Sequence, residues 1–305
     1  MPRYAGRVTV WGFGIVQAQE LERAGRSSFE ELCELVSEAT SIRFRPVIAT
    51  SYRELSAGIE RAEVGLAWLP PLPTIELESR RLTTVLGIPA RNGTTTYHSA
   101  LIVRRGGPRN VADLRMRRAV WVQRDSAAGY LVPRMHLATQ GIDVLRYFSR
   151  ELFVHSHPGV VDAIVNGDAD VGATYCHVDE TRKRAADEGH ERPQRIIRGA
   201  WVDDESRPIR PIEVLATFGP IPNDALVASN ELSASARSSL ARWLLGPSPT
   251  ARELFVRLLG SGDFRVPSPS HFDPLKHMLR AARARGQDAL PSSSRTGLRV
   301  FRRTT

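Results

Sequence analysis

The sequence predicts a two-lobed α/β fold in which a second α/β unit interrupts the first. Segments with strand and helix character alternate from the N-terminus, as in a parallel sheet covered by helices. The same alternation starts again after residue 105, and 305 residues suffice for two domains of ordinary size. Apolar runs at 97–105 and 213–218 flank the second unit, and we expect them to connect the lobes.

The first lobe opens with a strand–helix–strand–helix–strand series. In order, its members are predicted at 7–13, 27–39, 42–50, 51–63 and 64–69. The first helix carries apolar residues at helical spacing, among them Phe29, Leu32 and Val36. We expect Ser27 or Ser28 to cap that helix, because a serine hydroxyl accepts a hydrogen bond from the first-turn amides.

The second lobe repeats a strand, a loop and a helix twice between residues 111 and 176. A polar helix is predicted at 177–189. Three further helices are predicted after the returning strand, at 231–245, 249–259 and 272–285. The lobes are therefore predicted at 1–102 with 214–305, and at 103–213, and the tail from about 286 is predicted to be disordered. Because ligands of open α/β sheets bind outside the carboxyl ends of strands, we expect a hinged cleft between the lobes.

Charge and cysteine content narrow the function classes. The net charge is +9, but the seven Arg and one Asp from Arg280 onward contribute +6, so the rest of the chain carries about +3. The chain before Arg280 is too weakly basic to indicate a nucleic-acid-binding domain. We therefore expect no nucleic-acid partner. The cysteines, Cys33 and Cys176, do not indicate a disulfide framework. No stretch approaches the roughly 20 apolar residues of a membrane span, so we expect no membrane insertion.

The first residues carry no recognisable secretory signal. Their apolar run is short and is broken by Thr9, Gly12 and Gly14. From the sequence as written we expect a cytoplasmic protein, and a periplasmic one if a leader precedes the chain.

Two strand-to-helix turns in the second lobe are candidate anion sites. In the first, a strand ends at Gln123 and a helix starts near Ser126, with the small residues Ala127 and Ala128 behind it. A helix N-terminus with free amides and a serine hydroxyl binds anions, although an ordinary capping serine is commoner. In the second turn, His157 is predicted at a helix start, where it is either an anion donor or a capping or surface histidine.

Three further turns place polar side chains where the cleft is expected. Tyr52 lies in the first turn of a predicted helix, Tyr97 opens a connecting strand, and Asp224 follows the returning strand. No phosphate-binding loop, dinucleotide-binding glycine motif, zinc-protease motif, paired Cys-x-x-Cys or hydrolase nucleophile elbow occurs. The sequence therefore indicates no cofactor, no metal and no known catalytic motif.

Taken together, these ordered segments resemble the substrate-binding proteins of phosphonate, phosphite and phosphate ABC transporters. The matching runs are ATSY, GLAW, TYHSALIVRR, DSAAGYLVP, SHPGVVDAIVNGDADVGA, GPIPND and the late GSGDFRVPSPSHFDPLK, over about residues 7 to 280. The resemblance implies a type II solute-binding, periplasmic-binding-protein-like fold with a hinged interlobe cleft. It also implies binding of a small phosphonate- or phosphate-like oxyanion, with a transporter permease or a signalling protein as partner.

The resemblance also implies roles for particular residues. In that family a hydroxyl cluster at a helix start and a histidine at the next helix hold the anion, and here Ser126 and His157 match them. The aromatic cleft positions match Tyr52 and Tyr97, and an acidic cleft residue matches Asp224.

Three residues depart from the family pattern. Ala127 and Ala128 stand where hydroxyls are expected, and His177 stands where aminophosphonate binders carry an acidic residue. We therefore expect a ligand without an amine, either a smaller anion or one with a second acidic arm that meets His177.

Two other functions remain open. A biosynthetic enzyme on the same fold would use the His, Tyr and Cys side chains of the cleft for acid–base chemistry, namely His98, His157, Tyr175, Cys176 and His177. A regulator domain of the kind fused to DNA-binding heads is disfavoured, because no helix-turn-helix precedes residue 7.

Overall fold

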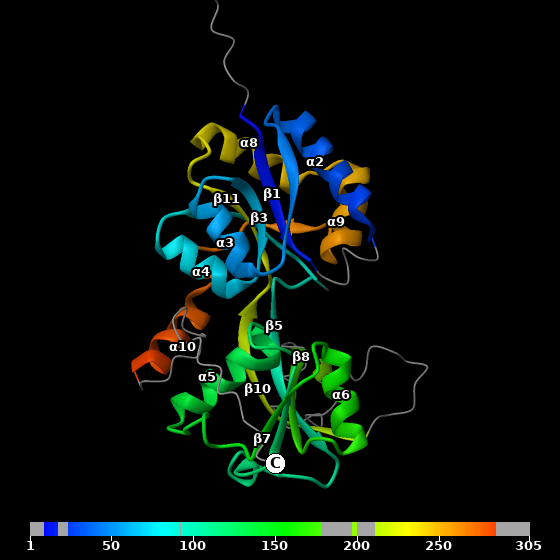
Figure 1. Cartoon of the computed structure of the whole chain (residues 1–305), viewed down its shortest axis with the longest axis vertical. Helices are drawn as coiled ribbons and strands as arrows, with labels where there is room; N and C mark the ends of the chain where they lie inside the picture. The colour runs from blue at the N-terminus through cyan, green and yellow to red at the C-terminus, as the bar shows by residue number, and fades with distance from the viewer. Residues whose placement is uncertain (1–8, 18–23, 92, 179–196, 200–210, 285–305) are drawn as a thin grey trace, which may run out of the picture. The chain divides into compact units, whose positions relative to one another are not determined.

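The computed structural model describes residues 9–17, 24–91, 93–178, 197–199 and 211–284. They form two compact units (Figure 1). Unit 1 takes the chain up to Tyr97 and Pro220–Lys276, and unit 2 takes His98–Gly219 and the chain from His277. The second unit is therefore inserted in the first. The polar helix predicted at 177–189 lies almost wholly outside the described residues, and the tail from 286 lies entirely outside them.

Unit 1 is built on one mixed sheet with the strand order β12-β4-β11-β3-β1-β2. Strand β1 pairs in parallel with both β2 and β3, whereas β11 is antiparallel to β3 and to β4. The strands are β1 Trp11–Val16, β2 Phe44–Ala49, β3 Val64–Leu69, β4 Thr83–Pro89, β11 Ala225–Ser229 and β12 Phe264–Arg265.

Helices cover both faces of this sheet. One face carries α3 and α4, and the other carries α2, α8 and α9, as Figure 1 shows. The core on the second side includes Phe13, Phe29 and Phe255, which are fully buried. The helices are α2 Arg26–Thr40, α3 Tyr52–Glu60, α4 Pro71–Ser79, α8 Ala234–Leu245 and α9 Pro249–Leu259.

Most of the expected elements of unit 1 are present, with three corrections. The capping prediction for α2 was wrong: its N-cap is Gly25, without a side-chain hydrogen bond, and Ser28 Oγ donates to the Ala24 carbonyl at 2.7 Å. Helix α4 was not predicted, although Pro71 occupies its first turn, where no amide hydrogen bond is required. Strand β11 was not predicted: the sequence indicates a turn at 218–227, yet Ala225–Ser229 is a central, fully buried strand.

Unit 2 has a second sheet with the order β10-β5-β8-β6-β7, and β9 pairs with β8. In Figure 1, α5 and α6 lie on opposite sides of this sheet. Its elements are β5 Thr96–Arg104, a short 3-10 turn η1 Ala112–Leu114, β6 Arg118–Trp121, a π-helical turn η2 Ala127–Leu131, α5 Val132–Thr139, β7 Arg150–Phe153, α6 His157–Asn166, β8 Val171–Val178, β9 Ile197–Gly199 and β10 Ile212–Pro222. The third C-terminal helix, α10 Asp273–Ala284, spans the division between the units.

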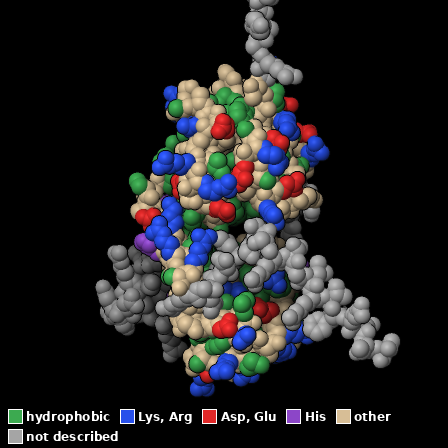
Figure 2. Space-filling model, turned by 60° about the vertical axis from the view of Figure 1, so that its left-hand side comes forward, with side chains coloured by type: hydrophobic (Ala, Val, Ile, Leu, Met, Phe, Trp, Pro, Cys, Tyr) green, Lys and Arg blue, Asp and Glu red, His purple; other side chains and the backbone are tan. Residues whose placement is uncertain are grey.

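On the face of unit 1 that Figure 2 shows, charged side chains of both signs are mixed. Figure 2 shows Lys and Arg interspersed with Asp and Glu over unit 1. Among the described residues, no helix is both long and apolar enough to cross a membrane.

Candidate functional site

The sheet of unit 2 brings two helix starts to the same edge. Strands β6 and β7 are parallel neighbours, with Trp121 opposite Phe153 at their ends. The first strand leads to η2 and α5, and the second leads to α6. Because the carboxyl ends of parallel strands share one edge, both helix N-termini lie at that edge. In α6, however, Pro158 has no N–H and the Gly159 amide donates to Ser156 Oγ at 3.1 Å. We call Ser126, Ala127, Ala128 and His157 the unit 2 cluster.

Ser126 caps the helical turn η2. Its Oγ accepts a hydrogen bond from the Gly129 amide at 3.1 Å, and Ala127 and Ala128 behind it are buried. The fully buried Ser99 of β5 donates from its Oγ to the Ala128 carbonyl at 2.7 Å and so ties the turn to the sheet. The capping role is thus present, and Ala127 and Ala128 occupy the first turn after the cap, where a helix leaves N–H groups without an intrahelical partner.

His157 begins α6 as the sequence indicated, with Ser156 as the capping residue. Its Nδ1 lies 2.9 Å from Thr174 Oγ1 and accepts from the Tyr175 amide at 3.4 Å, both on β8. An imidazole that accepts at Nδ1 carries its proton on Nε2. Burial lowers the pKa of His157 to about 4, so at neutral pH the ring is an uncharged donor with one N–H.

His177 lies on β8 beyond Tyr175, in a short row of rings. The His157 and Tyr175 ring centroids are 4.9 Å apart with an interplanar angle of 84°, and Tyr175 and His177 are 6.0 Å apart. Strand register also places Tyr175 opposite Ser99, the residue that holds η2. The structure therefore connects the Ser126 turn, His157 and His177 through two adjacent strands.

Three other predicted residues gather in unit 1. Tyr52 is the first residue of α3, which Ser51 caps by accepting from the Glu54 amide at 3.2 Å. Burial raises the pKa of the Tyr97 phenol, and the nearby carboxylate of Asp224 raises it further. The positive charge of Arg91 acts in the opposite direction and lowers the pKa of Tyr97. Tyr52 lies close enough to raise this pKa as well. We call Tyr52, Arg91, Tyr97 and Asp224 the unit 1 cluster.

Sequence reasoning missed several residues that shape these clusters. Arg91, Ser99 and Thr174 were not predicted, and neither was Asn223, whose Nδ2 donates to the Pro89 carbonyl at 2.9 Å. Ser99 and Asn223 fall within the matching runs TYHSALIVRR and GPIPND, but nothing in those runs singles them out, and Arg91 and Thr174 lie outside every matching run. Their roles come from strand register and from a turn, which a single sequence does not reveal.

The two cysteines are poorly suited to nucleophilic catalysis. Cys33 and Cys176 are both buried, and burial raises the pKa of each thiol to about 12. Thiols with such values are not thiolate nucleophiles at neutral pH. Within the described ranges, no group of three or more His, Cys, Asp or Glu side chains could hold a metal ion.

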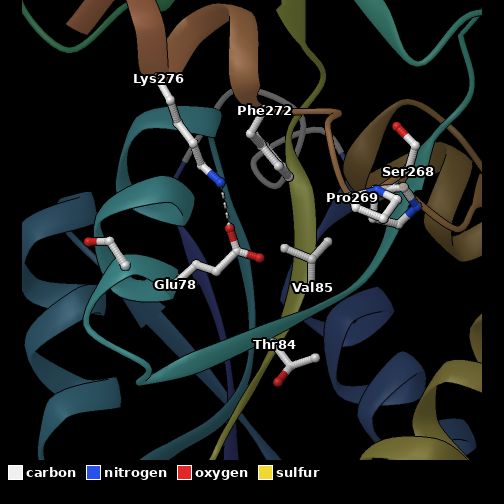
Figure 3. Close-up of a pocket in the computed structure, with 9 residues that line it drawn as sticks. Glu78, Thr84, Val85, Ser268, Pro269, Phe272 and Lys276 are labelled. Atoms are coloured by element: carbon white, nitrogen blue, oxygen red, sulfur yellow. Dashed lines mark hydrogen bonds and ion pairs between the residues drawn. The ribbon is translucent and has the colours of Figure 1, made fainter. Parts of the chain in front are cut away.

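Unit 1 also contains a pocket of about 430 Å³ away from the predicted residues. Figure 3 shows the Glu78 carboxylate and the Lys276 ammonium facing one another in it, 3.4 Å apart. Its lining residues are Glu78, Ser79, Thr84, Val85, Pro267, Ser268, Pro269, Phe272 and Lys276. No member of the unit 1 cluster lines this pocket, so the two are separate features.

Comparison with known proteins assigns the class. Residues 14–272 match the family model of the periplasmic substrate-binding proteins of phosphonate ABC transporters. The match covers most of the chain, and the protein belongs to this family. The resemblance seen in the sequence is thereby confirmed, and the protein is a substrate-binding protein of the class that binds small oxyanions.

Solved structures share the fold. XAC2383 from Xanthomonas citri, bound to ATP, has a TM-score of 0.69 and 19% identity, over 91% of this chain and 98% of that chain. A binding protein component of an ABC phosphonate transporter from Pseudomonas aeruginosa has a TM-score of 0.63 and 20% identity, over 92% and 88%. PhnD1 from Prochlorococcus marinus, in complex with methylphosphonate, has a TM-score of 0.63 and 13% identity, over 91% and 99%. These likenesses confirm the predicted type II solute-binding fold.

Proposed function

We propose that this protein binds a phosphonate or a closely related oxyanion with the unit 2 cluster and the unit 1 cluster together. The observation that carries the proposal is the pair of helix N-termini at one sheet edge, with the Nε2–H of a neutral His157 beside them. Helix dipoles and unpaired amides favour negative charge at such a point. Tyr52, Tyr97 and Asp224 would line the other side once the two units, acting as lobes, close over the ligand.

The ligand class follows from the three departures in sequence. Ala127 and Ala128 offer only backbone amides where hydroxyls are expected, so the anion is held by fewer side-chain donors. His177 places an imidazole beside the Tyr175 ring, where aminophosphonate binders carry a carboxylate. Both features favour a small phosphonate, or one with a second acidic arm, over an aminophosphonate.

We infer that the physiological role is delivery of the ligand to an ABC transporter permease. The description of the family as periplasmic supports this role over the cytoplasmic sensing that the sequence also allows. Fractionation of the native host distinguishes them, since a periplasmic protein supports transport and a cytosolic protein supports sensing. The raised pKa of the Cys176 thiol and the lowered pKa of His157 count against the enzyme alternative, because a general acid or base works best with a pKa near the operating pH.

Calorimetric titration of the full chain with methylphosphonate, phosphate and phosphite tests the proposal. Replacing Ser126 and His157 together by Ala should weaken the tightest of these by at least about tenfold, because two donors to the anion are lost. Ser248→Ala is the matched control, since Ser248 caps α9 in the same way, accepting from the Ala251 amide at 3.2 Å. Unchanged affinity in the double variant would contradict the site, and no binding of any of the three by the wild type would contradict the ligand class.

A further inference from the structure

Arg91 stands in a tightly held turn at the end of β4. Its amide donates to the Thr94 carbonyl at 2.8 Å, and the Thr94 amide donates back to the Arg91 carbonyl at 3.0 Å. Gly93 within this turn has a φ of 78°, a left-handed conformation that glycine adopts without steric cost. The backbone of Arg91 is therefore fixed relative to the sheet of unit 1.

The guanidinium of Arg91 is anchored as well. Its Nη2 donates to the Leu259 carbonyl at 2.9 Å, at the C-terminus of α9. The side chain passes over Gly260, where an added Cβ would lie 3.8 Å from Nη2. A cation at this end of a helix is favoured by the helix dipole and by the unpaired carbonyls of the last turn.

Asp224 is tied to the same turn through its neighbour Asn223. The Asn223 amide donates to the Thr95 carbonyl at 2.9 Å, and its Nδ2 donates to the carbonyls of Pro89 and Thr94. With both backbones fixed in this way, Arg91 Nη2 lies 4.0 Å from Asp224 Oδ2. The contact joins two half-buried side chains, which are 35% and 26% exposed, so water screens the pair only in part.

We infer that Arg91 determines ligand specificity in the unit 1 cluster: its guanidinium neutralises Asp224, and the cluster therefore favours phosphonates with an uncharged or acidic substituent over those that end in an ammonium group. Without Arg91, the carboxylate of Asp224 would attract an ammonium and repel a phosphonate dianion. With Arg91, the pair carries no net charge and adds N–H donors. The inference rests on the proposed function, because it requires the unit 1 cluster to contact the ligand.

The test is the ratio of two dissociation constants, those of methylphosphonate and 2-aminoethylphosphonate, measured by calorimetry on the full chain. The wild type should bind methylphosphonate at least about tenfold more tightly. Arg91→Gln should shift the ratio by about tenfold or more toward 2-aminoethylphosphonate, which corresponds to about 1.4 kcal/mol. Arg91→Lys keeps the charge and should keep the wild-type ratio.

Two further variants isolate the charge of the pair. Arg91→Gln combined with Asp224→Asn removes both charges and should return the ratio toward that of the wild type. Arg80→Gln removes an exposed cation that pairs with Glu60 and should leave the ratio unchanged. Thermal unfolding checks that each variant is folded. If the Arg91→Gln variant does not fold, the ratio of the two dissociation constants in the wild type alone tests the inference.

One result would overturn the inference while the proposed function stands, namely a folded Arg91→Gln variant whose ratio stays within about twofold of the wild type. A wild type that prefers 2-aminoethylphosphonate would overturn the inference together with the ligand preference proposed above. A wild type that binds neither phosphonate would instead overturn the proposed function, and the inference with it.

Discussion

The imidazole of His157 makes one contact that its protonated form would lose. Nδ1 accepts from the Tyr175 amide, and a proton at Nδ1 would remove that hydrogen bond, whereas the Thr174 hydroxyl beside it can either donate or accept. Burial accounts for the depressed pKa of about 4. Bound as a neutral donor, His157 makes its hydrogen bond to an anion across the physiological pH range without a change of charge.

This pKa has a consequence for stability. The folded-state pKa lies below the ordinary value of 6.5, so as the pH falls the unfolded chain takes up the proton first. The free energy of unfolding is therefore unaffected by this histidine above about pH 6.5. It decreases as the pH falls toward 4, by at most about 3 kcal/mol. Urea unfolding at several pH values in this window measures the loss.

His157→Asn should lose less stability than the wild type over the same window. The pKa values of His136 and His271 are also lowered, but they contribute equally to both proteins. Parallel curves for the variant and the wild type would show that His157 does not titrate as described.

Single residues were predictable where a helix start exposed them. Ser126 and His157 follow strands and precede helices, and that pattern alone nominated both. Arg91 had no such signal, being one of 42 Lys and Arg residues and placed by a turn. Thr174 faces His157 only because β8 runs beside α6, a tertiary fact that no local pattern contains.

At the scale of elements, the turn η2 depends on a glycine with no room for a side chain. A Cβ at Gly129 would lie 2.4 Å from Val122 Cγ2 and 2.7 Å from Ser126 Oγ. Gly129→Ala should therefore destabilise the protein by about 1–3 kcal/mol through overpacking, and it should displace the capping serine. Urea unfolding together with the affinity for methylphosphonate measures the two effects.

Gly246→Ala is the matched control for this variant. Gly246 ends α8 with a φ of −141°, and the nearest atom to an added Cβ is the Arg242 carbonyl oxygen at 4.0 Å. Its stability should stay within about 0.5 kcal/mol of the wild type. If Gly129→Ala is as stable as this control, the close packing described for η2 is wrong.

Elements were predictable where apolar periodicity was clear, and β3 was placed at its observed bounds of Val64–Leu69. Helix α4 was not predicted because three prolines at its start suggest a loop. Pro71 nevertheless fits the first turn of a helix. Strand β11 escaped because its short apolar run follows a Pro–Asn–Asp turn, and only its position between β3 and β4 makes it a core strand.

For the whole molecule, the type II fold predicts that the ligand brings two lobes together. Saturating methylphosphonate should lower the radius of gyration measured by small-angle X-ray scattering. The Ser126→Ala, His157→Ala double variant should need at least about ten times more methylphosphonate for the same decrease. A wild type that binds the ligand with an unchanged radius of gyration would argue against closure.

The position of β11 also governs the order in which the chain can fold during synthesis. Residues 98–219 of unit 2 leave the ribosome as one stretch, but the sheet of unit 1 needs Ala225–Ser229 between β3 and β4. The edges of β3 and β4 that β11 will occupy therefore stay unpaired while more than a hundred further residues are translated. Exposed strand edges of this kind invite association with other nascent chains. The segment that carries β3 and β4 therefore depends on chaperone protection until β11 is made.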